Sequence, residues 1–171
     1  MKHLFTGIVL CLLSAGALAG ERGPALPDYP ADKIADNIYV IHGPLQYPDP
    51  ANQGFMNNPG IVLTDAGVVL LDPGSSVQSG EMVLRAVRKL SDKPVVAVFN
   101  SHVHGDHWLG NQAVRTAFPD AKIYGHPNMI RLVADGEGDS WVQRMATLTE
   151  GKTLGTRVVG PDQAVDHGDE I

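Results

Sequence analysis

Short runs rich in apolar residues alternate with polar or turn-forming segments along the chain, and each run has the length of a β-strand. The runs cover residues 37–42, 61–64, 68–71, 95–99 and 122–125. Asp65-Ala66-Gly67 joins the second and third runs and supplies glycine where a hairpin turn needs positive φ. The run at 95–99 is apolar at every position, which is typical of a strand buried on both faces. We therefore expect a sheet whose first strands pair as a hairpin.

Helical periodicity follows the third run. Ser75 and Gln78 have the spacing of a capping box, and Lys93-Pro94 ends the segment. Apolar residues between them recur at helical spacing: Met82, Val83, Ala86, Val87 and Leu90. A strand, this helix and the strand at 95–99 predict a βαβ unit with parallel strands, and hence an α/β fold. Shorter helices are expected over 110–118, 128–134 and 140–148.

The N-terminus has the pattern of an export signal over residues 1–19. Lys2 gives the positive end, residues 4–13 the apolar stretch, and Ala17-Leu18-Ala19 the small-residue cleavage site. A membrane anchor is the alternative, but the apolar stretch is shorter than the ~20 residues that span a bilayer. We expect an exported protein, periplasmic or secreted, with no membrane association once the leader is removed.

After the leader, residues 20–33 are rich in proline and predict a tether, and residues 34–171 form one domain. The only cysteine, Cys11, lies within the leader, so the mature protein has no disulfide, thiol nucleophile or thiolate ligand. The formal net charge is -6 and Lys and Arg form no cluster along the sequence, so nucleic acid is not an expected partner.

A histidine-rich segment directly follows the strand at 95–99. Its wording is Asn100-Ser101-His102-Val103-His104-Gly105-Asp106-His107. Imidazole and carboxylate groups suit zinc and similar divalent ions. In an extended segment His102, His104 and Asp106 point to one side, and a turn at Gly105 with positive φ would swing Asp106 and His107 toward a second ion. The alternative is a polar loop whose histidines are merely exposed.

This His-x-His-x-Asp-His segment resembles the signature of the metallo-β-lactamase superfamily. The resemblance extends to Asn58-Pro59-Gly60-Ile61-Val62-Leu63-Thr64 and to Val68-Val69-Leu70-Leu71-Asp72-Pro73-Gly74, which are similar to that family's opening strands. It implies an αββα sandwich and a hydrolase with one or two Zn2+ ions, although iron or manganese also occurs in such sites. With the leader, the wording is most similar to exported, quinoprotein-associated zinc hydrolases of that superfamily.

The resemblance also implies residue roles. His102 and His104 would bind the first metal, and Asp106 and His107 the second. Asp106 would also be catalytic, accepting the proton of a metal-activated water that attacks a small-molecule lactam, lactone, thioester or other ester. Asp72 either caps the turn with Pro73-Gly74 or, as the resemblance favours, orients a metal ligand.

Candidate substrate contacts lie on two segments. The loop at 45–57 is long enough to be functional, and its large apolar side chains, Tyr47, Phe55 and Met56, either contact substrate or pin the loop to the domain. Trp108 either walls the site or packs beneath it.

The family's remaining ligands, a third histidine for the first metal, a bridging carboxylate and a last histidine, come from the second half of its sandwich, and nothing in this sequence matches them. We therefore expect only the first half of the αββα sandwich. The rival interpretation is a non-catalytic metal-binding or assembly fragment, which self-associates or binds a partner half-domain.

Overall fold

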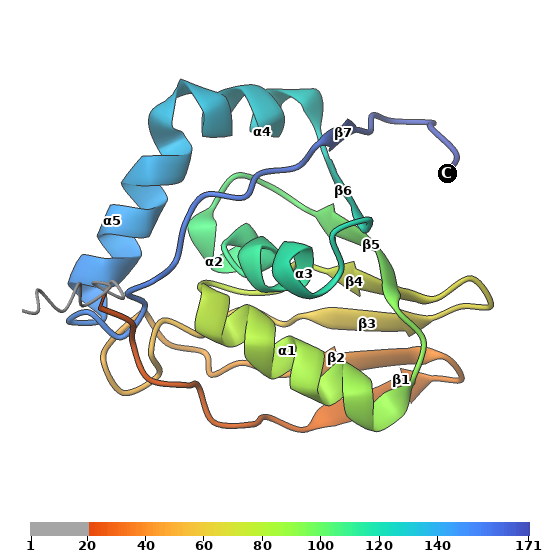
Figure 1. Ribbon diagram of the computed structural model, residues 1–171, viewed down its shortest axis with the longest axis horizontal. Helices are drawn as coiled ribbons and strands as arrows, with labels where there is room; N and C mark the ends of the chain where they lie inside the picture. The colour runs from red at the N-terminus through yellow and green to blue at the C-terminus, as the bar shows by residue number, and fades with distance from the viewer. Residues whose placement is uncertain (1–20) are drawn as a thin grey trace, which may run out of the picture.

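Alternating apolar residues build one seven-stranded sheet in the computed structural model, which describes residues 21–171 (Figure 1). The signal peptide predicted for residues 1–19 lies outside the described residues. The strands are β1 (Ala31–Ala35), β2 (Ile38–Ile41), β3 (Gly60–Leu63), β4 (Val68–Leu71), β5 (Val95–Asn100), β6 (Lys122–Gly125) and β7 (Gln163–Ala164). The helical segments are α1 (Val77–Leu90), α2 (Gly105–Trp108), α3 (Asn111–Ala117), α4 (Pro127–Leu132), the π-helical η1 (Val133–Glu137) and α5 (Gly138–Leu148).

The strands follow one another across the sheet in chain order, so each pairs with its neighbours in sequence. The strands β1 to β4 pair antiparallel, and β4 to β7 pair parallel. The expected hairpin at 61–71 and the βαβ unit formed by β4, α1 and β5 are both confirmed. Parallel pairing brings the carboxyl ends of β4, β5 and β6 to one edge, where α/β sheets place ligand sites.

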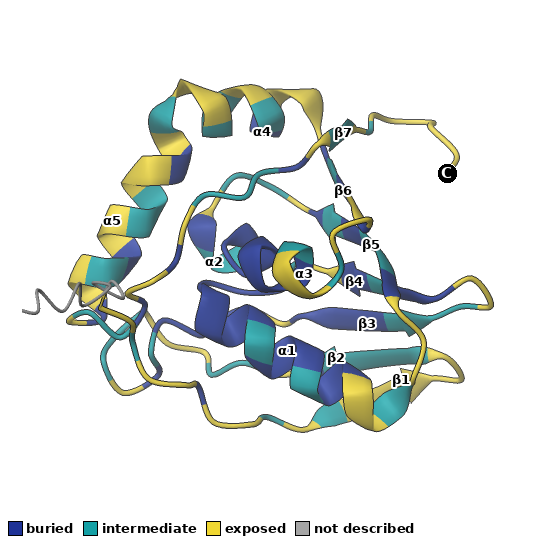
Figure 2. Ribbon diagram, viewed as in Figure 1, coloured by how far each residue is buried: buried dark blue, intermediate teal, exposed yellow. Residues whose placement is uncertain are grey.

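Helices α1, α2 and α3 cover one face of this sheet (Figure 1). The covered face is buried at Ile61, Leu70, Val98 and Ile123, and α1 turns its own buried side toward it (Figure 2). A first hydrophobic core forms between α1 and the sheet. The apolar side chains of α1, which recur about every 3.6 residues, pack there against the alternate apolar side chains of the strands.

The opposite face of the sheet has no buried apolar residue. Its side chains follow from the strand register: Ile38, Val40, Val62, Val69, Leu71, Ala97, Phe99 and Tyr124. All of these are half-buried or exposed, and the rings of Phe99 and Tyr124 stack with centroids 4.8 Å apart. The described residues therefore form one layer of helices on one face of one sheet, as expected for the first half of an αββα sandwich.

Helix α1 begins one residue later than the sequence spacing indicates. Its N-cap is Ser76, whose hydroxyl accepts a hydrogen bond from the Ser79 backbone, while the Ser79 hydroxyl accepts one from Ser76 N–H. The predicted capping pair Ser75 and Gln78 is wrong. The observed pair is Ser76 and Ser79, because a serine hydroxyl at the third helical position can accept the bond from the N-cap N–H as a glutamine would.

The proline-rich segment before β1 packs onto the domain. Leu26 is buried in the first core, and Asp28 forms ion pairs with Arg85 and Lys89 on α1, each at 2.6 Å. Residues 31–33 belong to β1. The tether predicted for residues 20–33 is therefore corrected over the described residues 21–33, because proline-rich sequence without strand or helix periodicity can still be fixed by ion pairs and one buried side chain.

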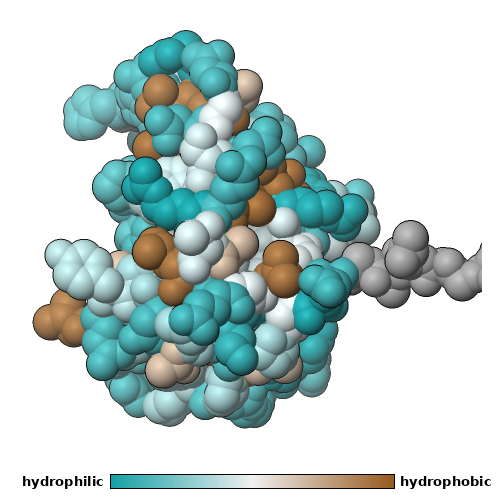
Figure 3. Space-filling model, turned by 90° about the vertical axis from the view of Figure 1, so that its left-hand side faces the viewer, coloured by the Kyte–Doolittle hydropathy of each residue, from teal (hydrophilic) through white to brown (hydrophobic). Residues whose placement is uncertain are grey.

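A second, smaller core supports the bent arm formed by α4, η1 and α5. Trp108, Leu109, Met129 and Met145 form this core, and the arm bends at Gly136, where φ is 111°. Figure 3, which views the molecule from the left-hand side of Figure 1, shows its apolar residues in separate patches among polar ones. Among the described residues, no helix has the length and apolar character needed to cross a membrane.

Candidate metal centre

The histidine segment lies at the carboxyl end of β5, beside the end of β4. Asp72 follows β4, and Ser101 follows β5. The backbone N–H of Ser101 donates to Asp72 Oδ1 at 2.8 Å, and the Ser101 hydroxyl donates to Asp72 Oδ2 at 2.6 Å. The two strand ends are thereby joined through one carboxylate.

Asp72 also contacts His107. Its Oδ2 lies 2.8 Å from Nδ1 of His107, which fixes which ring nitrogen points away from the carboxylate. Asp72 has a positive φ of 48°, a backbone conformation that aspartate tolerates better than most residues. The carboxylate therefore fixes the ring of His107, and its role in orienting a metal ligand stays a prediction.

The loop between the two predicted ligand pairs does not turn as expected. Gly105 has no positive φ but begins helix α2, with His104 as its N-cap residue. Gly105 instead allows α5 to pack closely against α2, because a Cβ at this position would lie 2.8 Å from Cβ of Trp141 on α5. The positive-φ turn at Gly105 is therefore wrong, and helix α2 directs Asp106 and His107 instead.

Three imidazoles gather at this edge of the sheet. The ring centroids of His102 and His104 are 4.7 Å apart, and those of His102 and His107 are 4.2 Å apart. Asp106 Oδ2 lies 3.2 Å from His107 Nε2. All four residues predicted to bind metal therefore lie in one cluster, within reach of one another.

Electrostatics within the cluster separate two of the histidines. Burial acts to lower the pKa of His107, but hydrogen bonds to Asp106 and Asp72 outweigh it and raise that pKa to about 9. Burial and the neighbouring imidazoles lower the pKa of His102. Asp106 loses solvation, which acts to raise its pKa, yet the hydrogen bond with His107 leaves it below its usual value. The arrangement is that of an imidazolium between two carboxylates.

Within residues 21–171, no three His, Cys, Asp or Glu side chains stand as a group ready to hold a metal ion. The donor chemistry nevertheless fits such an ion. The Ser101 hydroxyl engages Nδ1 of His102 at 2.9 Å, which leaves Nε2 available, and Asp106 Oδ2 and His107 Nε2 face each other at 3.2 Å. His102, His104, Asp106 and His107 would hold the ion once His107 has lost its proton.

The predicted substrate contacts fare unevenly. Phe55 is fully buried, with its ring edge-on to Tyr29 at 4.8 Å, so it pins its loop and cannot touch substrate. Trp108 is also fully buried and donates from Nε1 to Val103 O at 2.8 Å, so it packs under the loop. Both are corrected, since large apolar rings gain most free energy by burial. Tyr47 is 89% exposed and Met56 is half-buried, and nothing places either at the cluster.

Two neighbours of the cluster could not be found from the sequence. The Trp141 ring on α5 lies 5.2 Å from the His104 ring, because the bend at Gly136 brings α5 back over the loop. His126 is the N-cap of α4 and accepts a hydrogen bond from Asn128 N–H. His126 also lines a hollow of about 260 Å3 beside His102, together with Met129 and Leu132.

Comparison with known proteins places this geometry in a family. The model of the metallo-beta-lactamase superfamily matches residues 52–170, and the chain belongs to that superfamily. A linear primary-alkylsulfatase of Pseudomonas sp. is 29% identical over 102 residues, which cover 57% of this chain and 19% of the relative. A hydroxyacylglutathione hydrolase of Acaryochloris marina is 31% identical over 93 residues, covering 47% of this chain and 36% of the relative.

Solved structures agree on the fold. A subclass B3 metallo-beta-lactamase of Bradyrhizobium japonicum superposes with a TM-score of 0.58 at 21% identity, over 85% of this chain and 48% of that one. The FEZ-1 metallo-beta-lactamase of Legionella gormanii gives 0.59 at 18% identity, over 86% and 50%. This chain thus spans about half the length of these structures and a smaller share of the curated relatives.

Proposed function

We propose that this chain carries the first metal ligands of a zinc-dependent hydrolase that acts on a lactam, lactone, thioester or other ester. One observation carries the proposal: His102, His104, Asp106 and His107 cluster at the carboxyl edge of the sheet, with Asp72 bound to His107 behind them. When bound, zinc would polarise a carbonyl and lower the pKa of water toward ~7. Iron or manganese could occupy the same donor set.

The chain's own residues would prepare this chemistry. Asp72 Oδ2 holds the Nδ1 side of His107, so that the Nε2 side faces Asp106 and the ligand cluster. Asp106 Oδ2 accepts a hydrogen bond from His107 Nε2. In the proposed reaction the same carboxylate would accept a proton from a nucleophilic water. The Trp141 ring lies beside the His104 ring and would help to hold its orientation.

Among the substrate classes, a thioester has support from the 31% identity with a protein named as a hydroxyacylglutathione hydrolase. The lactam has support from the fold alone, because identities with the metallo-beta-lactamase structures are 18% to 21%. We therefore place the thioester ahead of the lactam for the whole protein.

The deciding experiment compares wild type with His104→Ala, using His42→Ala as a matched control. His42 is an exposed histidine at the end of β2 with 60% of its side chain accessible, outside the cluster. After reconstitution with zinc and desalting, elemental analysis should show that His104→Ala loses most of its metal while His42→Ala keeps it. Equal zinc content in all three proteins would contradict the proposal.

A non-catalytic metal-binding or assembly role is the second candidate. It is favoured by the lack of any ready group of three metal-binding side chains within the described residues, whereas a catalytic zinc usually has three protein ligands. Turnover of an S-acyl glutathione thioester or a chromogenic lactam, measured on the zinc-loaded chain, separates the two. Zinc retention without turnover would support the second candidate.

Export and partners complete the proposal. A leader cleaved after Ala19 would give a periplasmic or secreted protein that begins at Gly20, which intact-mass measurement of the exported fraction tests. The half-exposed apolar face of the sheet supports self-association or a partner half-domain. Sedimentation of the purified chain at increasing concentration would test that.

A further inference from the structure

A cleft lies between α1 and α3 and shares no residue with the histidine cluster. Its volume is about 570 Å3, within the range of ~300–1,000 Å3 usual for small-molecule sites. Small and branched apolar side chains line it: Val77 and Leu84 from α1, and Ala113 and Ala117 from α3.

Four of the chain's seven arginines line the same cleft, together with one acid, Glu81. The arginines are Arg22, Arg85, Arg88 and Arg157. Arg85 and Arg88 are one turn apart on α1, whereas Arg22 and Arg157 are far from them in sequence and are brought to the cleft by the fold. The cleft is therefore lined mainly by positive charge, although the chain as a whole has a net charge of -6.

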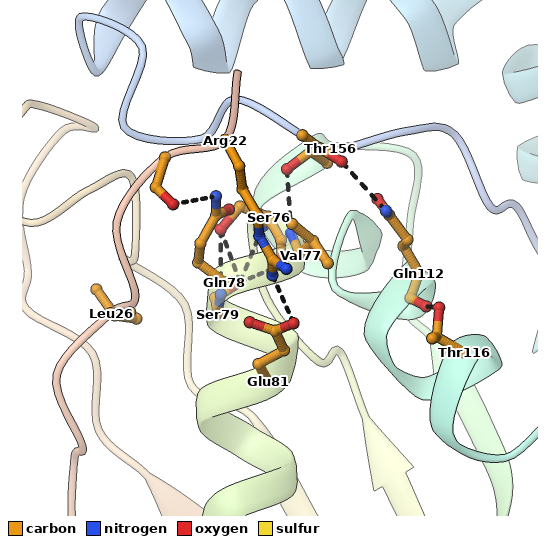
Figure 4. Close-up of polar contacts among 12 residues, drawn as sticks. Arg22, Leu26, Ser76, Val77, Gln78, Ser79, Glu81, Gln112, Thr116 and Thr156 are labelled. Carbon is orange, nitrogen blue, oxygen red and sulfur yellow. Dashed lines mark hydrogen bonds and ion pairs between the residues drawn. The ribbon is translucent and has the colours of Figure 1, made fainter. Parts of the chain in front are cut away.

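Two of these guanidinium groups are already paired within the protein. Arg22 lies 2.5 Å from Glu81 (Figure 4). Arg85 donates to Asp28 and to the carbonyl of Leu26, each at 2.6 Å. Arg88 and Arg157 form no side-chain hydrogen bond or ion pair with any described residue. The cleft therefore keeps two positive charges that the described residues do not neutralise.

The wall that carries Arg157 is fixed by buried polar side chains. Gln112 on α3 donates to Gly155 O at 3.1 Å and accepts from Arg157 N–H at 2.6 Å. Thr156 accepts from Val77 N–H, the first residue of α1, at 3.1 Å (Figure 4). Gln112 and Thr156 are each only 8% exposed. These bonds hold the 155–157 segment against both helices, so the cleft is a built feature of the fold.

We propose that this cleft binds a small amphipathic anion, with a phosphate or carboxylate head at Arg88 and Arg157 and a short alkyl chain over Leu84, Ala113 and Ala117. Guanidinium groups hold both kinds of head through charge-assisted hydrogen bonds. The apolar floor adds affinity for the chain in proportion to the area it covers. The site is separate from the metal centre and does not depend on its chemistry.

Isothermal titration of the full chain with hexyl phosphate, hexanoate and inorganic phosphate tests the proposal. Saturable binding of hexyl phosphate or hexanoate is expected, at least about tenfold tighter than inorganic phosphate because of the alkyl chain. Arg88→Gln and Arg157→Gln should each weaken it about tenfold, the effect of losing a charge-assisted hydrogen bond. Arg131→Gln, which removes an exposed arginine of α4 outside the cleft, should leave binding unchanged.

Three outcomes would overturn it. One is the absence of saturable binding with both amphipathic probes. Another is inorganic phosphate binding as tightly as hexyl phosphate, which would remove the role of the apolar floor. The third is equal weakening by Arg131→Gln and by the two cleft variants, which would show diffuse attraction to positive charge. Arg88 and Arg157 are both exposed, so their substitution leaves the core intact and all three outcomes remain readable.

Discussion

Replacing Asp72 with asparagine tests how the strand ends organise the candidate metal centre. Asparagine has nearly the same shape, and its Oδ1 can still accept the bond from Ser101 N–H. It has no second acceptor, however, for the Ser101 hydroxyl or for His107 Nδ1, both of which donate to Asp72 Oδ2. The substitution therefore removes charge and two bonds while keeping the turn, including the positive φ at this residue.

The magnitude follows from the bond to His107. A hydrogen bond to a charged group contributes ~1.5–3 kcal/mol, and the lower end applies here because 25% of the His107 side chain and 15% of the Asp72 side chain are exposed. About 1.4 kcal/mol corresponds to one pH unit in a pKa. The His107 pKa should thus fall by about one pH unit from its value of about 9 in the metal-free protein. Loss of a residue that orients a ligand should weaken zinc binding roughly 10- to 100-fold.

Two measurements on the same sample check these numbers. A histidine NMR titration of the metal-free protein gives the pKa, and competition with a chelator gives the zinc affinity. Asp65→Asn, which neutralises an exposed aspartate in the β3–β4 turn, is the matched control and should change neither. An Asp72→Asn protein with the wild-type His107 pKa and wild-type zinc affinity would refute the reasoning.

Three further predictions concern stability. Folding raises the pKa of His107 from 6.5 to about 9, so its contribution to stability is complete below pH 6.5 and is lost as pH rises through about 9. Urea unfolding of the metal-free protein should therefore show a falling free energy of unfolding across that pH range. A constant value there would contradict the prediction. Gly105→Ala should lower the free energy of unfolding by about 1–3 kcal/mol, because the new Cβ would lie 2.8 Å from Trp141 Cβ. Thermal unfolding checks this, with Ser140→Ala at an exposed position of α5 as the control. Equal melting temperatures for the two variants would contradict the prediction. Hydrogen bonds from Lys89 and Arg85 lower the pKa of Asp28, so the attachment of residues 21–30 to α1 should be present above pH 3.8 and lost as pH falls below it. Asp28→Asn should therefore make residues 21–30 accessible to proteases at neutral pH. Digestion at the wild-type rate would contradict this.

Local patterns were sufficient for the elements that depend on local physics. Strands β3, β4 and β5 were predictable because their apolar runs are bounded by turn residues, and helix α1 because its stripe is regular. The histidine segment could be predicted as a cluster because it follows a parallel strand, whose end faces the edge of the sheet. For Asp72 the residues alone left a turn-capping role open, and the orienting role was favoured by the family resemblance; in the structure the parallel pairing of β4 and β5 brings Asp72 beside the cluster.

What could not be predicted depends on contacts between distant segments. The burial of Phe55 and Trp108 is decided by which side chains meet across the core, which a single sequence does not encode locally. The approach of Trp141 to His104 depends on one bend at Gly136, more than thirty residues after His104. The arginine-lined cleft could not be predicted from the sequence for the same reason, because Arg22 and Arg157 lie near opposite ends of the described chain.

The packing of residues 21–30 has a consequence for how the chain acquires its structure. Gly23 N–H donates to Leu154 O at 2.9 Å, and Gln78 donates to the same carbonyl at 2.8 Å. This part of the domain therefore closes only after residue 154 has been made, and contacts of such long sequence separation form late in folding. As the chain is made, Asp28 can find Arg85 and Lys89 first, whereas Gly23 stays without its partner until nearly all of the described sequence has followed, so the docking of Gly23 would be among the last steps of folding.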